Sequence, residues 1–331
     1  MKLRKLGRSD LEVSRIALGT DQFGTRVDRA AARKIIFAAL NRGINFIDTA
    51  HIYGDGLSEE FIGRAIKSVR NELILATKGG HPHSGGPTPE RLKAELETSL
   101  GRLKTDYIDL YQVHFMIGQT TPLAELIEVL QTMQRSGKVR YIGASNFHAW
   151  QLCRANDLCA QKGYGGFLSI QSHYSLLERD VEGELIPYCE YSGVALMPFY
   201  PLAGGLLAGR YRRATEPGPD TRAGRLDWAR RFFSHYATDR TFELIDRLTA
   251  FARARGHTLA ELALAWLLCR PAVSSVIVGA SRPEHVLANS RACDLQLNGD
   301  ELGEIGSILG DGDTFLGCPR RLWWEVRTVK P

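Results

Sequence analysis

Four polar side chains stand at or just beyond the ends of short apolar runs, and their types suit acid–base chemistry. They are Asp48, Tyr53, Lys78 and His114. A lysine ammonium beside a phenol stabilises the phenolate and so lowers the pKa of the tyrosine. A carboxylate beside that lysine keeps it charged and in place, and a neutral imidazole can orient a carbonyl oxygen. The set predicts a tyrosine that acts as a general acid or base near neutral pH.

Short apolar, β-branched runs recur through the chain and must position these side chains. They cover residues 15–18, 44–47, 73–77, 108–113, 141–142, 167–170, 194–198 and 273–278. The first residues of successive runs lie about 30 positions apart, which is the size of a βα unit. The exception is the last interval, which is longer. Strands that are apolar throughout and alternate with helices indicate a parallel sheet that helices cover. Eight such units predict an α/β fold, a (β/α)8 TIM barrel, with its active site at the C-terminal ends of the strands.

Helical patterns with capping signals fill the gaps between these runs. Asp28 is the expected N-cap of a helix that ends near Gly43. Thr88 followed by proline opens a second helix, because proline suits the first helical position. A third helix is expected over 123–133.

We expect the whole chain, residues 1–331, to form a single barrel domain with three additions. Residues 2–14 are predicted to be a β-hairpin that closes the bottom of the barrel. A polar segment, 203–240, is predicted to be a long loop at the C-terminal face, and a tail covers 310–331.

The composition argues against several classes of protein. The net charge of +5 is mild and no run of five like charges occurs, so nucleic acid is not an expected partner. The most apolar stretch, 258–279, is interrupted by Arg270 and Pro271, and it predicts a buried helix and strand rather than a membrane span. The first residues hold no apolar segment typical of a signal peptide, and the six cysteines form no CxxC pair. We therefore expect reduced cysteines and a cytoplasmic location.

Three segments around the four polar side chains resemble the aldo-keto reductase superfamily. They are GINFIDTAHIYGDG at 43–56, LILATK at 73–78 and DLYQVH at 109–114. The resemblance extends over about residues 1–310. It implies an NADPH-dependent carbonyl reductase in which Asp48, Tyr53, Lys78 and His114 are the catalytic tetrad.

Other segments are similar to those that hold the cofactor in this family. No GxGxxG motif follows a strand, so a Rossmann site is not expected. The resemblance implies instead that the dinucleotide lies extended across the barrel mouth under the 203–240 segment. Ser145, Asn146 and Gln171 would then bind the nicotinamide carboxamide, and Phe199 would stack on the nicotinamide ring. The remaining implied contacts are Gly19, Thr20, Asp48, Pro201, Leu202, Gly279, Ser281, Arg282 and Asn289.

The segment expected at the adenine end departs from the family pattern at Val278, His285 and Ala288. Arg282 is the local candidate for a 2′-phosphate partner, because a guanidinium pairs bidentately with phosphate. The alternative is a solvated arginine at a helix start. NADP(H) is thus the expected cofactor, with NAD(H) left open.

The substrate is expected to be a small aldehyde, ketone or sugar-like carbonyl, and the reverse reaction would make the protein a polyol or sugar dehydrogenase. The alternative is a cofactor-sensing regulatory subunit that resembles potassium-channel β subunits.

Three weaker features have more than one interpretation. Asp21 would face the cofactor or substrate rim, or serve as a structural cap. His81 and His83 have no obvious third partner, so no metal site is expected. The oligomeric state is left open, and Trp323 and Trp324 are placed in the substrate pocket or packed on the barrel.

Overall fold

Eight parallel strands form the central sheet. The computed structural model describes residues 1–116, 121–219 and 221–310. The strands are β3 (Ile16–Gly19), β4 (Phe46–Asp48), β5 (Ile74–Gly79), β6 (Ile108–Val113), β7 (Val139–Ser145), β8 (Phe167–His173), β9 (Ala195–Phe199) and β10 (Val276–Gly279). Chain neighbours are sheet neighbours, and β10 returns to pair with β3. The Leu196 N–H donates to the Ala272 carbonyl at 2.8 Å, so the segment before β10 also meets β9 and the sheet closes into a barrel.

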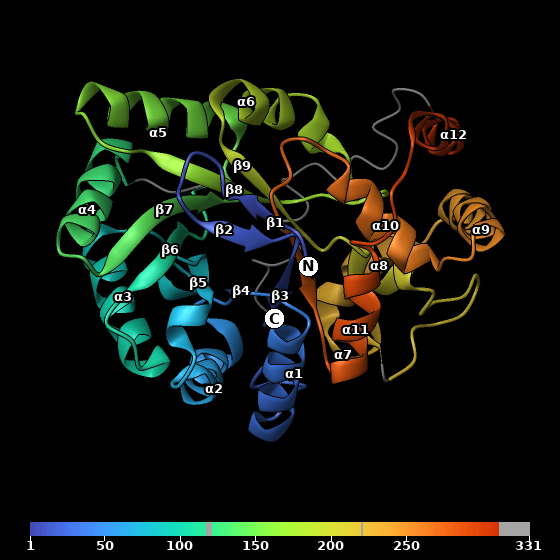
Figure 1. Ribbon diagram of the computed structural model, residues 1–331, viewed down its shortest axis with the longest axis horizontal. Coiled ribbons are helices and arrows are strands. Elements are labelled where there is room, and N and C mark those ends of the chain that lie inside the picture. Colours follow the sequence, from blue (N-terminus) through green and yellow to red (C-terminus); the bar gives the residue numbers. More distant parts are fainter. Residues whose placement is uncertain (117–120, 220, 311–331) are drawn as a thin grey trace.

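Helices surround these strands (Figure 1). Those that directly follow a strand unit are α1 (Arg29–Asn41), α2 (Leu57–Ile66), α3 (Pro89–Leu103), α4 (Leu123–Arg135), α5 (Ala149–Gln161), α6 (Leu185–Ser192) and α11 (Pro283–Arg291). Between β9 and β10 lie α7 (Arg222–Arg225), α8 (Asp227–Tyr236), α9 (Asp239–Ala254) and α10 (Leu259–Leu268), and α12 (Gly299–Leu309) comes last. The predicted (β/α)8 barrel is confirmed, and its strands all end at one face.

The helix caps expected from the sequence are present. Asp28 Oδ1 accepts the N–H of Ala31 at 2.8 Å and begins α1. Thr88 Oγ1 accepts the N–H of Arg91 at 3.3 Å and begins α3, with Pro89 at its first position. These bonds satisfy backbone donors that have no partner inside the helix.

Most strands extend beyond the C-terminal ends of their apolar runs, and β5 and β7 do so with polar residues. β5 continues past Thr77 to include Lys78, and β7 continues to Ser145. Both side chains are buried at the barrel end, Lys78 fully and Ser145 at 1% exposure. Polar residues can continue a buried strand here because they find polar partners inside the barrel.

A β-hairpin lies across the opposite end of the barrel. Its strands are β1 (Leu3–Lys5) and β2 (Glu12–Ser14), and they lie across the centre of the view in Figure 1. The buried side chains Leu6, Leu11 and Val13 pack with inward-facing residues of the barrel strands in one apolar cluster. Gly7 has a φ of 56°, and a Cβ there would collide with the Leu168 carbonyl, so the turn of the hairpin requires glycine.

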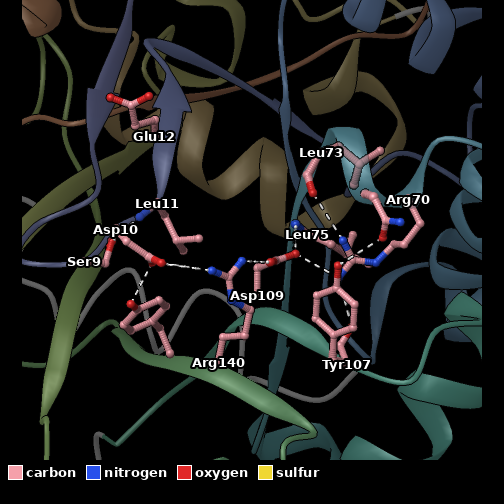
Figure 2. Close-up of polar contacts among 12 residues, drawn as sticks. Ser9, Asp10, Leu11, Glu12, Arg70, Leu73, Leu75, Tyr107, Asp109 and Arg140 are labelled. Carbon is pink, nitrogen blue, oxygen red and sulfur yellow. Dashed lines mark hydrogen bonds and ion pairs between the residues drawn. The ribbon is translucent and has the colours of Figure 1, made fainter.

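A network of ion pairs joins this hairpin to the sheet. Figure 2 shows Asp109 of β6 between Arg70 and Arg140. Each arginine contacts one Asp109 carboxylate oxygen at 2.8 Å, and Arg140 also reaches Asp10 of the hairpin at 3.3 Å. The Asp109 side chain is only 2% exposed, and its two guanidinium partners offset the loss of water.

The segment 203–240 holds more regular structure than the sequence analysis predicts. Instead of a continuous loop it contains α7 and α8. Phe232 and Tyr236 stand four residues apart on α8, so they share one face and are both buried. The Tyr236 hydroxyl donates to the buried Glu178 carboxylate. Such short helices rely on tertiary packing, which a short and arginine-rich sequence pattern does not reveal.

Among the described residues, no helix combines the length and the apolarity that crossing a bilayer requires. The apolar stretch 258–279 forms α10 and β10, as expected. The expectations for the tail beyond Gly310, including Trp323 and Trp324, lie outside the described residues.

Candidate active site

Lys78 lies at the centre of a polar group at the C-terminal face of the barrel. Its ammonium nitrogen donates to Asp48 Oδ2 at 2.7 Å, to the Thr49 carbonyl at 2.8 Å and to Tyr53 Oη at 3.3 Å. Burial alone would lower the pKa of Lys78, but the Asp48 carboxylate and Tyr53 outweigh it and the pKa is raised. Lys78 is therefore cationic at neutral pH beside a phenol, the arrangement that stabilises a phenolate.

Two glutamine amides hold the other oxygen of the Asp48 carboxylate. Gln112 Nε2 donates to Asp48 Oδ1 at 3.0 Å, and Gln171 Nε2 does so at 2.9 Å. Gln112 is a residue that the sequence analysis missed. It precedes His114 by two positions, so the alternation of an extended strand places both on the inward side of the barrel.

His114 stands beside Tyr53 in the same group. The centroids of the two rings lie 6.0 Å apart in an edge-to-face arrangement. The Phe115 ring stacks on the His114 ring with centroids 5.1 Å apart, and the backbone N–H of His114 donates to the Gly79 carbonyl at 2.7 Å. With 3% exposure, His114 is nearly buried. The fold thus brings all four predicted tetrad side chains together.

One cavity of about 860 Å³ is lined by Asp48, Tyr53 and His114 of this group and extends to α11, while Lys78 is buried behind it. Its volume lies within the range of roughly 300–1,000 Å³ that is typical of small-molecule sites. All the predicted cofactor residues line it: Gly19, Thr20, Asp48, Ser145, Asn146, Gln171, Phe199, Pro201, Leu202, Gly279, Ser281, Arg282 and Asn289. Barrel closure brings β10 next to β3, which explains why residues so distant in sequence share one cavity.

The cavity end near the tetrad presents amides and an aromatic ring. Asn146 has a φ of 58°, in the left-handed region that asparagine tolerates. Its Nδ2 donates to the His114 carbonyl at 3.1 Å and to Ser145 Oγ at 3.0 Å, which fixes the amide. The Phe199 ring stacks against His173 with centroids 5.7 Å apart, and it is half-buried at the cavity wall.

The other end of the cavity is strongly positive. Burial, followed by the charges of Arg210, Arg282 and Arg26, lowers the pKa of His285 to about 4. At neutral pH His285 is therefore uncharged, and the Ser281 N–H donates to its Nδ1 at 3.4 Å. Three guanidinium groups around a neutral imidazole suit an anionic ligand. Arg26 and Arg210 were not singled out from the sequence, because they come from loops that only the fold brings together.

An ion pair crosses from the β3 end of the cavity to α7. Arg222 Nη2 pairs with Asp21 Oδ2, and Arg222 Nη1 donates to the Tyr200 hydroxyl at 2.6 Å. Burial alone would lower the pKa of Arg222, but Asp21 and Tyr200 outweigh it and raise that pKa. Asp21 thus faces the cavity rim, which was one of the two alternatives left open by the sequence.

His81 lies beside His114 of the tetrad, and His83 lies next to His81. The His81 ring centroid is 4.9 Å from that of His83 and 4.8 Å from that of His114. The His83 N–H donates to His81 Nδ1 at 3.2 Å. In the described part of the chain no group of three His, Cys, Asp or Glu side chains could hold a metal ion. That the reaction uses no metal stays a prediction.

A parallel (β/α)8 barrel with a Lys–Asp–Tyr cluster beside a large cavity at its C-terminal face is the architecture of a class of barrel oxidoreductases. Residues 15–309 match the Aldo/keto reductase family. The chain belongs to this family and is an NAD(P)H-dependent oxidoreductase.

Several curated proteins are similar over nearly their whole length. An uncharacterized oxidoreductase, YrpG, of Bacillus subtilis is 36% identical over 93% of this chain and 96% of its own length. The NADH-specific methylglyoxal reductase of Escherichia coli is 32% identical over 90% of this chain and 95% of its own. A probable voltage-gated potassium channel subunit beta of Oryza sativa is 31% identical, over 89% and 92% respectively.

Proposed function

We propose that this protein reduces a small or sugar-like aldehyde or ketone to the alcohol with NADPH. The observation that carries the proposal is the contact of one buried ammonium, Lys78 Nζ, with both the Asp48 carboxylate and the Tyr53 hydroxyl. Run in reverse, the same groups would oxidise a polyol or a sugar. The Escherichia coli relative is named a methylglyoxal reductase, which supports a small carbonyl as the substrate class.

Tyr53 is the proposed proton donor to the carbonyl oxygen. The Lys78 ammonium at 3.3 Å stabilises the phenolate that remains after the transfer. Asp48, held by three donors, keeps that ammonium charged and in place. His114, whose ring lies beside that of Tyr53, would donate a hydrogen bond that orients the same oxygen.

The residues of the cavity fit a nicotinamide dinucleotide. When bound, the cofactor supplies the hydride for the carbonyl carbon. Ser145, Asn146 and Gln171 would hold the carboxamide, and Phe199 would cover one face of the ring. Arg282 and Arg210 at the positive end would hold the phosphate groups, because guanidinium groups pair with phosphate. The acidic neighbour of Arg282, Glu284, lies 4.0 Å away and is exposed to solvent. We propose that the segment 203–240 covers the bound cofactor.

A panel of aldehydes and ketones, run with NADPH and separately with NADH, tests the proposal. We expect cofactor oxidation at turnover numbers on the order of 1 s⁻¹ or more with at least one carbonyl and NADPH. The same chain as a cofactor-sensing regulatory subunit would bind NADPH without such turnover. If no carbonyl is reduced with either reduced cofactor, and no alcohol is oxidised with either oxidised cofactor, the proposed activity is contradicted.

Arg282→Ala tests the choice of cofactor. The Arg282 side chain is 67% exposed, so we expect the loss in NADPH binding near the lower end of the range for charged hydrogen bonds, about 1.5 kcal/mol or tenfold in Kd. NADH binding should stay nearly unchanged. Fluorescence titration of both cofactors measures the difference.

Arg291→Ala is the matched control, because it removes the same charge from the same helix at an exposed position outside the cavity. Equal losses for both cofactors, or no loss for either, would mean that Arg282 does not hold the 2′-phosphate. Arg222 and Arg225 would then be examined next.

We also propose that residues 1–331 act as one domain, with the hairpin 2–14 and the tail 310–331 as additions. The proposed partners are the cofactor and the carbonyl substrate. The cytoplasmic location and the lack of nucleic-acid and membrane partners stay predictions from the sequence.

A further inference from the structure

The loop that carries Tyr53 has an uncommon backbone. Directly after Tyr53, the residues Gly54, Asp55 and Gly56 have φ values of 56°, 54° and 92°. Aspartate tolerates the left-handed region better than most residues, but three consecutive residues with positive φ form an uncommon turn. Such a turn persists only where its surroundings hold it, so the position of the Tyr53 hydroxyl depends on what packs against the loop.

Arg102, on α3, contacts this loop on both sides of Tyr53. Its Nη1 donates to the His51 carbonyl at 3.0 Å and lies 3.3 Å from His51 Nδ1. Its guanidinium also lies directly over Gly56, where a Cβ would collide with it. One side chain thus contacts the residue two positions before Tyr53 and the residue three positions after it.

Glu59, on α2, connects Arg102 to the strand that carries Lys78. Glu59 Oε2 accepts from Arg102 Nη1 at 3.3 Å, and Glu59 Oε1 accepts from Thr77 Oγ1 at 2.6 Å. Glu59 is fully buried, whereas Arg102 is 24% exposed. Thr77 directly precedes Lys78, so the Glu59–Arg102 pair spans the loop of Tyr53 and the strand of Lys78.

We propose that Glu59 and Arg102 are positioning residues that hold the Tyr53 loop against β5, and thereby maintain the Tyr53–Lys78 contact on which proton transfer depends. Neither residue lines the cavity, so neither is expected to touch the substrate or the cofactor. This inference rests on the proposed role of Tyr53 as the proton donor.

The pH dependence of the reaction separates positioning from general support of the fold. The charged and titratable groups around Tyr53 are Lys78, Asp48 and His114 from the strand ends and Arg222 from α7. If the loop moves away from β5, the Lys78 ammonium stabilises the phenolate less. The alkaline limb of carbonyl reduction, which reports loss of the Tyr53 proton, should then move to higher pH.

The test uses the double variant Glu59→Gln with Arg102→Met, which leaves no uncompensated buried charge, together with Arg102→Lys. For the double variant we expect kcat to fall roughly 10- to 100-fold, since misplacement by about 1 Å has effects of that size. The KM for the carbonyl and the Kd for NADPH should change by less than about threefold. Arg102→Lys should have a kcat between those of the wild type and the double variant. The lysine ammonium keeps the positive charge but lacks the forked arrangement of N–H donors that a guanidinium has.

The matched control is Arg70→Met, which removes a guanidinium from the buried Asp109 at the opposite end of the barrel. It should lower Tm but leave kcat and the alkaline midpoint unchanged. The proposal is overturned if the double variant keeps the wild-type kcat and the wild-type midpoint of the alkaline limb. It is also overturned if Arg70→Met changes kcat and that midpoint as much as the double variant does.

A readout without activity keeps this test independent of the proposed function. Ultraviolet difference titration of each protein against its own Tyr53→Phe counterpart follows the Tyr53 phenolate directly. A higher titration midpoint for Tyr53 in the double variant supports the positioning role, and an unchanged midpoint overturns it. If the wild-type protein reduces no carbonyl, the proposed function fails while this titration still decides the inference.

Discussion

Tyr53→Phe is expected to lower kcat for carbonyl reduction by on the order of 10²-fold or more, the scale of general-acid catalysis. The substitution keeps the ring beside His114 and removes only the hydroxyl that lies 3.3 Å from Lys78 Nζ. Without that proton the oxygen must take one from water, so the loss should appear in kcat while cofactor binding changes little. Steady-state NADPH oxidation and a cofactor titration measure the two quantities.

Tyr107→Phe is the matched control for this variant. Its hydroxyl contacts Asn71 at 3.5 Å away from the cavity, so its removal should leave kcat unchanged. Turnover close to wild type in Tyr53→Phe would remove Tyr53 from the mechanism.

His114→Ala is expected to lower kcat by about 10²- to 10³-fold, the usual cost of removing one donor to a developing oxyanion. His114→Gln should retain more activity than His114→Ala, because the amide keeps a donor of similar reach. This order follows from the proposed role of His114 as a hydrogen-bond donor to the carbonyl oxygen, a role that the glutamine amide can partly fill. Steady-state kinetics of the two variants measure the difference.

The pH profile decides which residue supplies the proton. Carbonyl reduction should fall on the alkaline side as Tyr53 loses its proton, and this limb should persist in His114→Gln with a shifted midpoint. The raised pKa of Lys78 keeps its positive charge over this range. If the limb is lost in His114→Gln and persists in Tyr53→Phe, the roles are reversed and His114 is the proton donor.

The sequence predicted the barrel because its signals are local and periodic. Fully apolar runs at βα spacing indicate buried parallel strands, and the caps at Asp28 and Thr88 mark helix starts. The tetrad follows from the same logic. Parallel strands present their C-terminal ends to one face, so Asp48, Lys78 and His114 had to approach one another once the barrel was recognised.

Other parts of the site left no local signal. Gln112 stands inside an apolar strand, and only its inward direction together with the position of Asp48 makes it a partner. Arg222 and Asp21 are 201 positions apart and meet because α7 lies against the β3 end of the cavity. The segment that contains α8 is rich in arginine, so its helical pattern was not recognised from the sequence.

The sequence itself determined the types of the reacting groups, the order of the strands and the face on which the site lies. These features can be read locally, because the spacing of apolar residues and the ends of strands are properties of neighbouring residues. The tertiary structure decided which polar side chains share a carboxylate, which arginines surround His285 and what holds the Tyr53 loop. Those pairings depend on distances of about 3 Å between segments far apart in the chain, and local patterning sets no such distance.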